Sequence, residues 1–302
     1  MVRPVKFRMN EQTAVNNYFQ EDLKLKNNEI NNKAQQEFDA FVLKLRSVGV
    51  TVIVVQDLES QDTPDSIFPN NWVSFHENGD VAIYPMFAEN RRPERREDIF
   101  EEIENHGYLI NNIVDYTTAE EENIFLEGTG SLALDRKNRK AYCALSPRAD
   151  EELMIEFCED FEYTPVIFTA YQTVKNERLP IYHTNVMMCL AETFAIICLD
   201  CIDDKKERKN VLKHLKEDGL EVITISEDQV AQFAGNMLQI KSSDEKRFLV
   251  MSEAAHKSLT SDQITKINRH CDILSSPIDT IETCGGGSAR CMMAEVFLPK
   301  GD

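Results

Sequence analysis

Five short apolar segments recur along this chain at intervals of 51 to 59 residues. They begin at Asn71, Gly130, Asn185, Asn236 and Arg290, and each follows a small or turn-forming residue. A fixed period of about 50 residues is typical of repeat architectures, in which a single unit cannot bury its own apolar face. Closing such units into a ring would protect the edges of their sheets. The competing interpretation is a chance similarity among short buried strands.

The pattern between these segments alternates strands with helices. A strand is expected over residues 50–55, and a hairpin joins residues 72–76 to 81–84 through a turn at Asn78-Gly79. Helices are expected over residues 20–47, 94–105, 150–158, 205–217 and 260–270. Strands that alternate with helices along a whole chain indicate an α/β fold. We therefore predict one domain, residues 1–302, built as a five-bladed α/β propeller of ββαβ units around a central site.

Composition narrows the class of protein. The formal charge of −19 repels phosphate backbones and anionic membranes, so we expect neither nucleic acid nor membrane as a partner. The eight cysteines, several within apolar runs, are expected to be buried thiols in a reducing compartment and not a disulfide framework. The N-terminus lacks a secretory apolar core. The most apolar stretch, residues 186–199, is too short to span a bilayer and contains Glu192. We expect a cytoplasmic protein, and the sequence does not indicate its oligomeric state.

A cysteine and a histidine stand at matching places in the repeat. Cys291 follows the glycine run 285–287, where the backbone turns tightly and a ligand can approach the main chain. His183 leads into the third repeat segment. Because a thiolate is the attacking form and an imidazole can carry its proton, such a pair suits nucleophilic catalysis. An isolated cysteine would more often be a buried thiol.

Two acids occupy similar positions ahead of other repeat segments. Glu127 lies before the second segment and Asp65 before the first. Either acid alone could be a turn or capping residue. Together with Cys291 and His183 they predict one site at the mouths of successive units, where a carboxylate could orient the histidine or bind a substrate N–H group.

Other chemistries have weaker support in the sequence. Cys284 is the main rival nucleophile, but it precedes the glycines and lies off the repeat. Cys198 and Cys201 form a single C-x-x-C pair without a second pair, so we expect no metal site and no cofactor. The glycine run lacks the G-x-G-x-x-G spacing of a nucleotide site, and no papain-type cysteine motif is present.

The motifs around these residues resemble those of a known superfamily, the guanidino-group-modifying enzymes or amidinotransferases, which have the pentein fold. Arginine deiminase, dimethylarginine dimethylaminohydrolase and arginine:glycine amidinotransferase belong to it. The resemblance covers nearly the whole chain and is carried by residues 64–72, 125–128, 145–148, 183–185 and 286–291. With Arg3-Pro4 and residues 10–13, the chain most resembles the citrulline-utilising hydrolases of that superfamily.

The resemblance implies a covalent mechanism. Cys291 would attack the central carbon of a guanidinium or ureido group, and His183 would protonate the departing amine and then activate water. Glu127 would hold His183 and a substrate N–H group. Reactions of this class hydrolyse a C–N bond in a small amino acid and need no cofactor.

The resemblance also implies residues that bind the substrate. Asp65 would bind near the reacting group, and Arg148 would hold the carboxylate of the amino acid. Arg95 would add a second contact to the substrate, although Arg91, Arg92 and Arg96 in the same run are equally available.

Three asparagines distinguish this chain from relatives that bind a cation. Asn70, Asn71 and Asn185 stand where those relatives commonly have carboxylates. A buried cation needs an opposite charge, whereas amides suit a neutral ureido group. The favoured substrate is therefore citrulline-like. A deiminase, dihydrolase or amidinotransferase acting on arginine or a modified arginine is the alternative, and a non-catalytic binding propeller is a further one.

Overall fold

Four three-stranded sheets of the same construction organise the molecule. The computed structural model describes residues 1–301, and in each sheet the first strand is antiparallel to the second and the second is parallel to the third. The strands are β3 (Val73–Phe75), β4 (Asp80–Ile83) and β5 (Asn112–Asp115); β6 (Leu132–Asp135), β7 (Lys140–Leu145) and β8 (Thr164–Thr169); β11 (Met188–Leu190), β12 (Phe194–Ile197) and β13 (Glu221–Thr224); β14 (Leu238–Lys241), β15 (Arg247–Ser252) and β16 (Asp272–Ser276).

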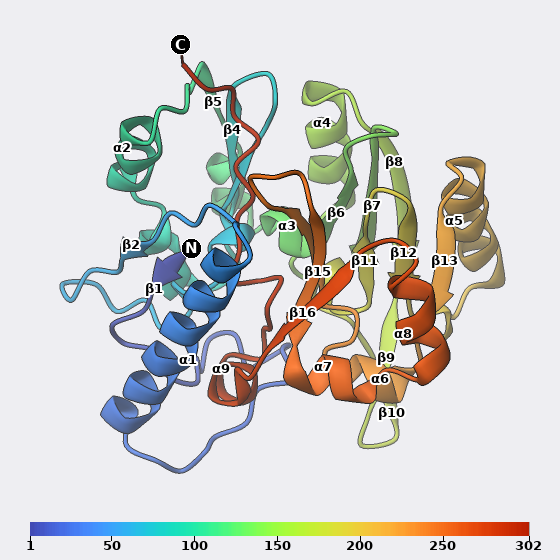
Figure 1. Cartoon of the computed structure of the whole chain (residues 1–302), viewed down its shortest axis with the longest axis horizontal. Helices are drawn as coiled ribbons and strands as arrows, with labels where there is room; N and C mark the ends of the chain where they lie inside the picture. Colours follow the sequence, from blue (N-terminus) through green and yellow to red (C-terminus); the bar gives the residue numbers. More distant parts are fainter. Residues whose placement is uncertain (302) are drawn as a thin grey trace.

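Helices connect the second and third strands of each sheet, as parallel pairing requires. The connecting helices are α2 (Glu97–Asn105), α4 (Glu151–Asp160), α5 (Lys205–Glu217), and the pair α7 (Glu253–Ser258) and α8 (Ser261–Ile267). Figure 1 shows α2, α4, α5 and α8 around the outside of the strands. The predicted α/β fold and the ββαβ order of four units are confirmed.

The fifth predicted unit differs from the other four. The segment that begins at Arg290 is not a strand, because Cys291 N donates to Ser288 O and Met293 N donates to Arg290 O, at 3.0 and 3.2 Å, which folds it into turns. The N-terminal part of the chain supplies only β1 (Val2–Arg3) and β2 (Val55–Gln56), a parallel pair. A closed five-bladed propeller is therefore not confirmed.

The long helix α1 (Asn27–Ser47) connects β1 and β2 and begins later than the predicted residue 20. The residues before it form separate turns, with Ala14 N donating to Asn10 O and Asn17 N to Thr13 O. A left-handed Lys24 (φ 53°) separates these turns from the helix. The predicted strand 50–55 is likewise reduced to β2.

Each repeat segment begins with a turn and not with a strand residue. Asn71 ends the 3₁₀ turn Pro69–Asn71, Gly130 lies in the one-turn helix α3 (Gly128–Ser131), and Asn185 lies in the 3₁₀ turn Thr184–Val186. Asn236 follows a turn in which its N–H donates to Phe233 O. The polar residues of the repeat therefore precede their strands.

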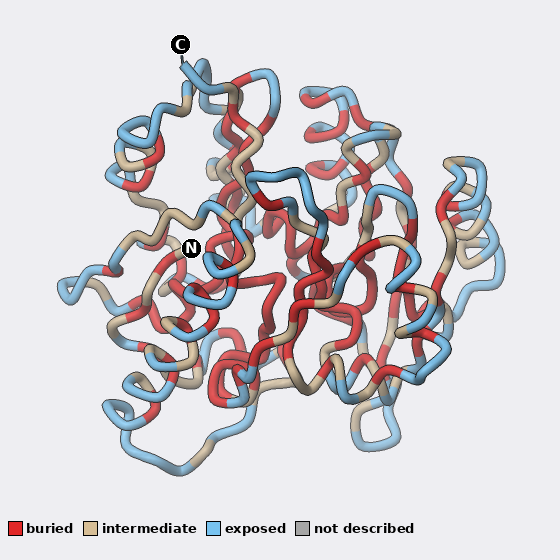
Figure 2. The backbone as a smooth tube through the Cα atoms, in the orientation of Figure 1, coloured by how far each residue is buried: buried red, intermediate tan, exposed pale blue. Residues whose placement is uncertain are grey.

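The remaining elements are short: β9 (Tyr171–Val174) pairs with β10 (Glu177–Pro180), and α6 (Glu227–Val230) and α9 (Asp279–Gly285) complete the described chain. Buried backbone fills the centre of Figure 2, and exposed backbone follows the outer helices and loops. All eight cysteines are free and buried, as predicted. Over residues 1–301, every helix is too short or too polar to pass through a lipid bilayer.

Candidate active site

Glu127 and His183 form a buried pair between the second and third units. His183 Nε2 lies 2.7 Å from Glu127 Oε2, and Glu127 Oε1 accepts a hydrogen bond from Phe87 N at 3.0 Å. Glu127 directly precedes α3, and the next residue, Gly128, has φ +44°. A Cβ at Gly128 would lie 2.4 Å from Asn70 O, so only glycine allows this approach.

The surroundings of this pair favour an ionised acid and a neutral imidazole. Burial alone would raise the pKa of Glu127, but Arg148 and His183 together hold it well below its usual range. Burial lowers the pKa of His183 to about 4, although the hydrogen bond to Glu127 acts in the opposite direction. An ionised carboxylate only accepts, so we assign the His183 proton to Nε2, which leaves Nδ1 as the basic nitrogen.

Gly130 lies against the other side of the imidazole. A Cβ there would come within 2.8 Å of His183 Nδ1 and within 2.5 Å of Asn71 Nδ2. The missing side chain lets the basic nitrogen of His183 and the amide of Asn71 approach the same space.

Cys291 is buried and lies in the turn after the glycine run. Its Sγ accepts hydrogen bonds from Asn236 Nδ2 at 3.2 Å and from Asn185 Nδ2 at 3.5 Å. Asn185 Nδ2 also donates to Thr129 O, which fixes its orientation, and Asn185 Oδ1 is buried with no hydrogen-bond partner. The thiol therefore has two amide donors beside it.

Asp65 is almost fully buried near the N-terminal segment. Its Oδ2 accepts from Asn10 Nδ2 at 2.8 Å and from Thr13 Oγ1 at 3.1 Å, whereas Oδ1 is buried without a partner. Burial raises the pKa of this carboxyl, and the nearby Arg91 acts against that rise.

The arginine of the 91–96 run that reaches the site is Arg91 and not Arg95. Arg91 Nη1 donates to Asn71 Oδ1 at 2.7 Å, and its Nε donates to Glu94 Oε1 at 2.9 Å. Arg95 Nη2 donates to Glu120 Oε2 at 3.1 Å. Arg95, to which we assigned the second substrate contact, is engaged in this ion pair and does not line the cavity that Arg91 lines, so a contact between Arg95 and substrate stays a prediction.

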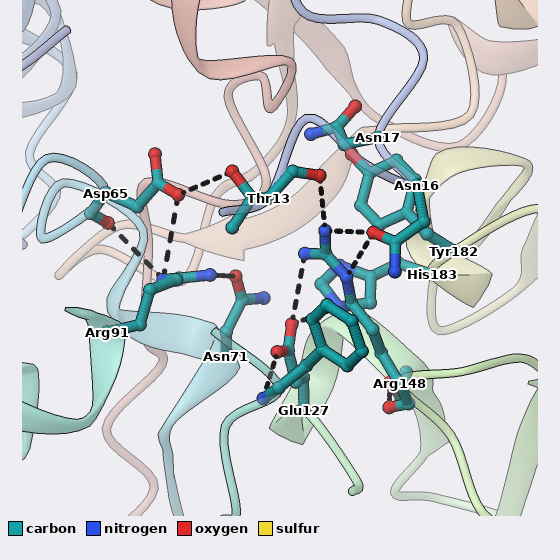
Figure 3. A network of polar contacts seen from close by, with 12 residues as sticks. Thr13, Asn16, Asn17, Asp65, Asn71, Arg91, Glu127, Arg148, Tyr182 and His183 are labelled. Atoms are coloured by element: carbon teal, nitrogen blue, oxygen red, sulfur yellow. Dashed lines mark hydrogen bonds and ion pairs between the residues drawn. The ribbon is translucent and has the colours of Figure 1, made fainter. Parts of the chain in front are cut away.

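Arg148 lies between the N-terminal segment and Glu127 (Figure 3). Its Nη2 donates to Thr13 O at 2.9 Å and its Nε to Asn16 Oδ1 at 2.9 Å, while Nη1 lies 3.4 Å from Glu127 Oε2. The ring of Tyr182 lies 4.9 Å from the guanidinium carbon. Residues of the N-terminal segment thus occupy the donors of a buried arginine.

These side chains enclose a small cavity of about 10 Å³, room for about one water molecule. It is lined by Thr13, Asn17, Asp65, Phe68, Asn71, Arg91, Arg148, Tyr182, His183, Gly285, Gly287 and Cys291. A larger cavity of about 1040 Å³ is lined by residues such as Trp72, Leu238 and Met293, and neither Cys291 nor His183 borders it. The reactive groups therefore converge on the small, buried space.

Most of the predicted site residues meet here. Cys291, His183, Asp65, Asn71 and Arg148 line the cavity. Three others contact residues of the lining: Glu127 bonds His183, Asn185 bonds Cys291, and Asn70 Oδ1 accepts from Asn71 Nδ2. Arg95 does not line the cavity and pairs with Glu120. The rival nucleophile Cys284 packs in an apolar cluster with Phe38 and Ile281. Within residues 1–301, no three His, Cys, Asp or Glu side chains gather as a metal site would require.

Sequence reasoning missed several contributors. Asn236 occupies the same place in the fourth repeat segment as Asn71 and Asn185 in theirs, so the repeat itself was a signal for it. Arg91 was named only as one of three equal alternatives to Arg95, because nothing local distinguishes it within its run of arginines. Thr13 and Asn16 reach the site through contacts across more than a hundred residues, which no local pattern predicts.

Solved structures of low sequence identity share this fold. ArgZ, an arginine dihydrolase of cyanobacteria, superposes with a TM-score of 0.75 at 14% identity over 99% of this chain and 40% of that chain. AgrE gives 0.71 at 17% identity over 100% and 39% of the two chains. A dimethylarginine dimethylaminohydrolase in adduct with S-methyl-L-thiocitrulline gives 0.60 at 16%, over 87% and 88%.

This chain spans about two fifths of the full ArgZ and AgrE chains. The isolated N-terminal domain of ArgZ alone gives a TM-score of 0.72 at 14% identity, over 99% of this chain and 98% of that domain. No curated protein sequence matches this chain.

One family model covers nearly all of the sequence. The model of eukaryotic N,N dimethylarginine dimethylhydrolase matches residues 3–298. This span includes Glu127, His183 and Cys291. The chain therefore belongs to the N,N dimethylarginine dimethylhydrolase family, hydrolases of the guanidino-group-modifying superfamily.

Proposed function

We propose that this protein hydrolyses a guanidino C–N bond of an arginine-type amino acid, N-methylated arginine included, through a covalent cysteine intermediate. One observation carries the proposal: the thiol of Cys291 and the imidazole of a buried Glu127–His183 pair border the same cavity. A nucleophile, a base and a group that orients the base are the parts that covalent catalysis needs. The family match supports the same reaction class.

In the proposed first step, the Cys291 thiol passes its proton to His183 Nδ1 as Sγ bonds to the guanidino carbon. The C–N bond to the leaving amine then breaks, and the amine departs with the proton that His183 took from the thiol. An S-alkylthiouronium remains on Cys291. His183 takes a proton from water, the oxygen bonds to the same carbon, and the C–S bond breaks to release citrulline and the thiolate. Glu127 keeps the His183 ring oriented throughout.

Two buried acceptors without partners support a guanidino substrate. Asp65 Oδ1 and Asn185 Oδ1 are both buried acceptors without partners. A guanidinium carries only N–H donors, so in the cavity that Asp65 lines it would give Asp65 Oδ1 a partner. A negative Asp65 would also compensate the buried positive charge.

A citrulline-like substrate, hydrolysed to ornithine, ammonia and carbon dioxide, is the second candidate. The two amides on Cys291 Sγ and the amide of Asn71 support it, because they add no negative charge beside the reacting carbon. In this case a ureido oxygen would need a donor, which Asn71 or Asn185 would supply after a change of partners.

The substrate carboxylate is proposed to bind Arg148. Its guanidinium now donates to Thr13 O and Asn16 Oδ1, two acceptors that a carboxylate would replace. The cavity is far too small for an amino acid, so substrate entry requires residues 10–20 to move away.

The decisive experiment incubates the purified protein with citrulline, arginine and N,N-dimethylarginine and follows products and protein mass by mass spectrometry. Citrulline with dimethylamine or ammonia, and an adduct on Cys291, would support the guanidino reading. Ornithine formed from citrulline itself would favour the second candidate. Cys291→Ala should abolish turnover, whereas Cys284→Ala should retain most of it; an active Cys291→Ala protein would exclude the covalent mechanism.

The same assay separates the remaining alternatives. A guanidino group passed to an added amine would indicate an amidinotransferase, and complete inactivity with tight binding of arginine would indicate a binding protein.

We also propose that residues 1–302 act as one domain, with 294–298 beside β1 as the fifth unit. Val2, Val296 and Leu298 share one apolar cluster, which supports this arrangement.

A further inference from the structure

Asn236 connects three units of the fold at the thiol. Its Nδ2 donates to Cys291 Sγ at 3.2 Å and to Asn185 O at 3.1 Å, and its Oδ1 accepts from Arg290 N at 3.1 Å. The side chain is buried, with 1% exposed. It therefore reaches from the fourth unit to the third and to the turn that carries Cys291.

This set of contacts fixes how the amide points. Exchanging its nitrogen and oxygen would set the amide nitrogen against the donor Arg290 N, and the oxygen against the acceptor Asn185 O. Both would be buried mismatches, each costly. One N–H therefore bonds Asn185 O, and the other is aimed at the sulfur of Cys291.

The direction of this bond decides which form of the sulfur it favours. An amide N–H can only donate, so the sulfur must be the acceptor. A thiolate accepts more strongly than a thiol, and hydrogen bonds to a charged group stabilise the charged form. His183 is paired with Glu127 and is neutral, so it brings no positive charge to the thiolate.

We infer that Asn236 is a positioning residue that stabilises the thiolate of Cys291 and orients it within its turn, with Asn185 as a weaker second donor. The catalytic role of Asn236 rests on the proposed function, whereas its hydrogen bond to Cys291 Sγ does not depend on that function. Loss of this donor would leave the sulfur protonated at higher pH and free to rotate.

Alkylation tests the inference without any substrate. Wild type, Asn236→Ala, Asn236→Asp and the exposed control Asn268→Ala are treated with iodoacetamide over a range of pH, and the rate at Cys291 is read by peptide mass spectrometry. The midpoint of each curve reports the ionisation of that thiol. Other titratable or charged groups bordering the cavity, unchanged in every variant, are Asp65, Arg91, Arg148, Tyr182 and His183.

We expect Asn236→Ala to raise the midpoint by about one pH unit, and to lower kcat/KM at neutral pH about tenfold or more. Asn236→Asp keeps the acceptor for Arg290 N and the size of the side chain, but it places an oxygen against both Asn185 O and Cys291 Sγ. It should raise the midpoint further, since it replaces the donor by an acceptor. Asn268→Ala should match wild type.

A wild-type midpoint in the folded Asn236 variants would overturn the inference, whatever their activity. Failure of the proposed function looks different: wild type would turn over no guanidino or ureido substrate, yet the shift in the alkylation midpoint would still appear.

Discussion

At the scale of single residues, the site depends on one position without a side chain. Gly130 allows Asn71 and His183 to approach, since a Cβ there would come within 2.5 Å of the Asn71 amide nitrogen and within 2.8 Å of the His183 ring. We predict that Gly130→Ala lowers kcat/KM at least a hundredfold, because the imidazole must leave its position to avoid the methyl group.

The matched control for this change is Gly301→Ala, where a Cβ meets no atom closer than 3.4 Å. Steady-state kinetics and a thermal melt of both variants separate catalysis from folding. A Gly130→Ala enzyme with normal kcat/KM would mean that His183 tolerates displacement.

The protonation of His183 also belongs to this scale. Because burial lowers its pKa to about 4, the ring should stay neutral from pH 5 to 8. Its imidazole resonances in a two-dimensional NMR titration should therefore not shift across that range, with His183→Gln identifying the signal. A midpoint near 6.5 would contradict the neutral imidazole assigned to His183.

The same lowered pKa has a defined effect on stability. Between about pH 6.5 and 4 the unfolded chain binds a proton at this histidine and the folded chain does not, so this group reduces stability as the pH falls through that window. Denaturant titrations should show a flatter pH dependence for His183→Gln than for wild type over this interval.

At the scale of elements, the turns over residues 10–20 cover the cavity instead of extending α1. Asn16 Oδ1 holds Arg148, where we propose that a substrate carboxylate binds. We predict that Asn16→Ala lowers KM several-fold with little change in kcat, because the substrate no longer displaces this acceptor. Initial-rate kinetics check the result.

Asn28→Ala, an exposed change within α1, is the control for that variant. An unchanged or raised KM for Asn16→Ala would show that the segment assists binding and does not compete with it.

At the scale of the whole molecule, stability depends on how closely one unit approaches the next. Gly235 lies in the fourth unit, and a Cβ there would come 2.2 Å from Val186 O and 2.7 Å from Met187 Cα of the third. We predict that Gly235→Ala lowers the free energy of unfolding by about 1–3 kcal/mol, because two backbones must separate. Urea denaturation measures this, and Gly301→Ala should leave the midpoint unchanged.

Particular elements show how much of the fold could be predicted from the sequence. The helix over residues 205–217 was predicted to the residue, since an Asp204 cap and an apolar stripe are local signals. The strand at Arg290 was wrong, because hydrogen bonds from Cys291 N and Met293 N close turns there. The repeat pattern marked the polar positions correctly but assigned them to strands, although they lie in the turns before them.

The sequence by itself determined the α/β class, the ββαβ order that four of the five predicted units have, and the residue types near the cavity, because apolar spacing and motifs act over short stretches of chain. Only the tertiary structure decided that Arg91 and not Arg95 lines the cavity. It also decided that Asn236 bonds Cys291 and that Asn16 Oδ1 accepts a hydrogen bond from Arg148. The physical reason is distance along the chain. Asn16 and Arg148 are 132 residues apart, and such contacts exist only once separate units have packed together.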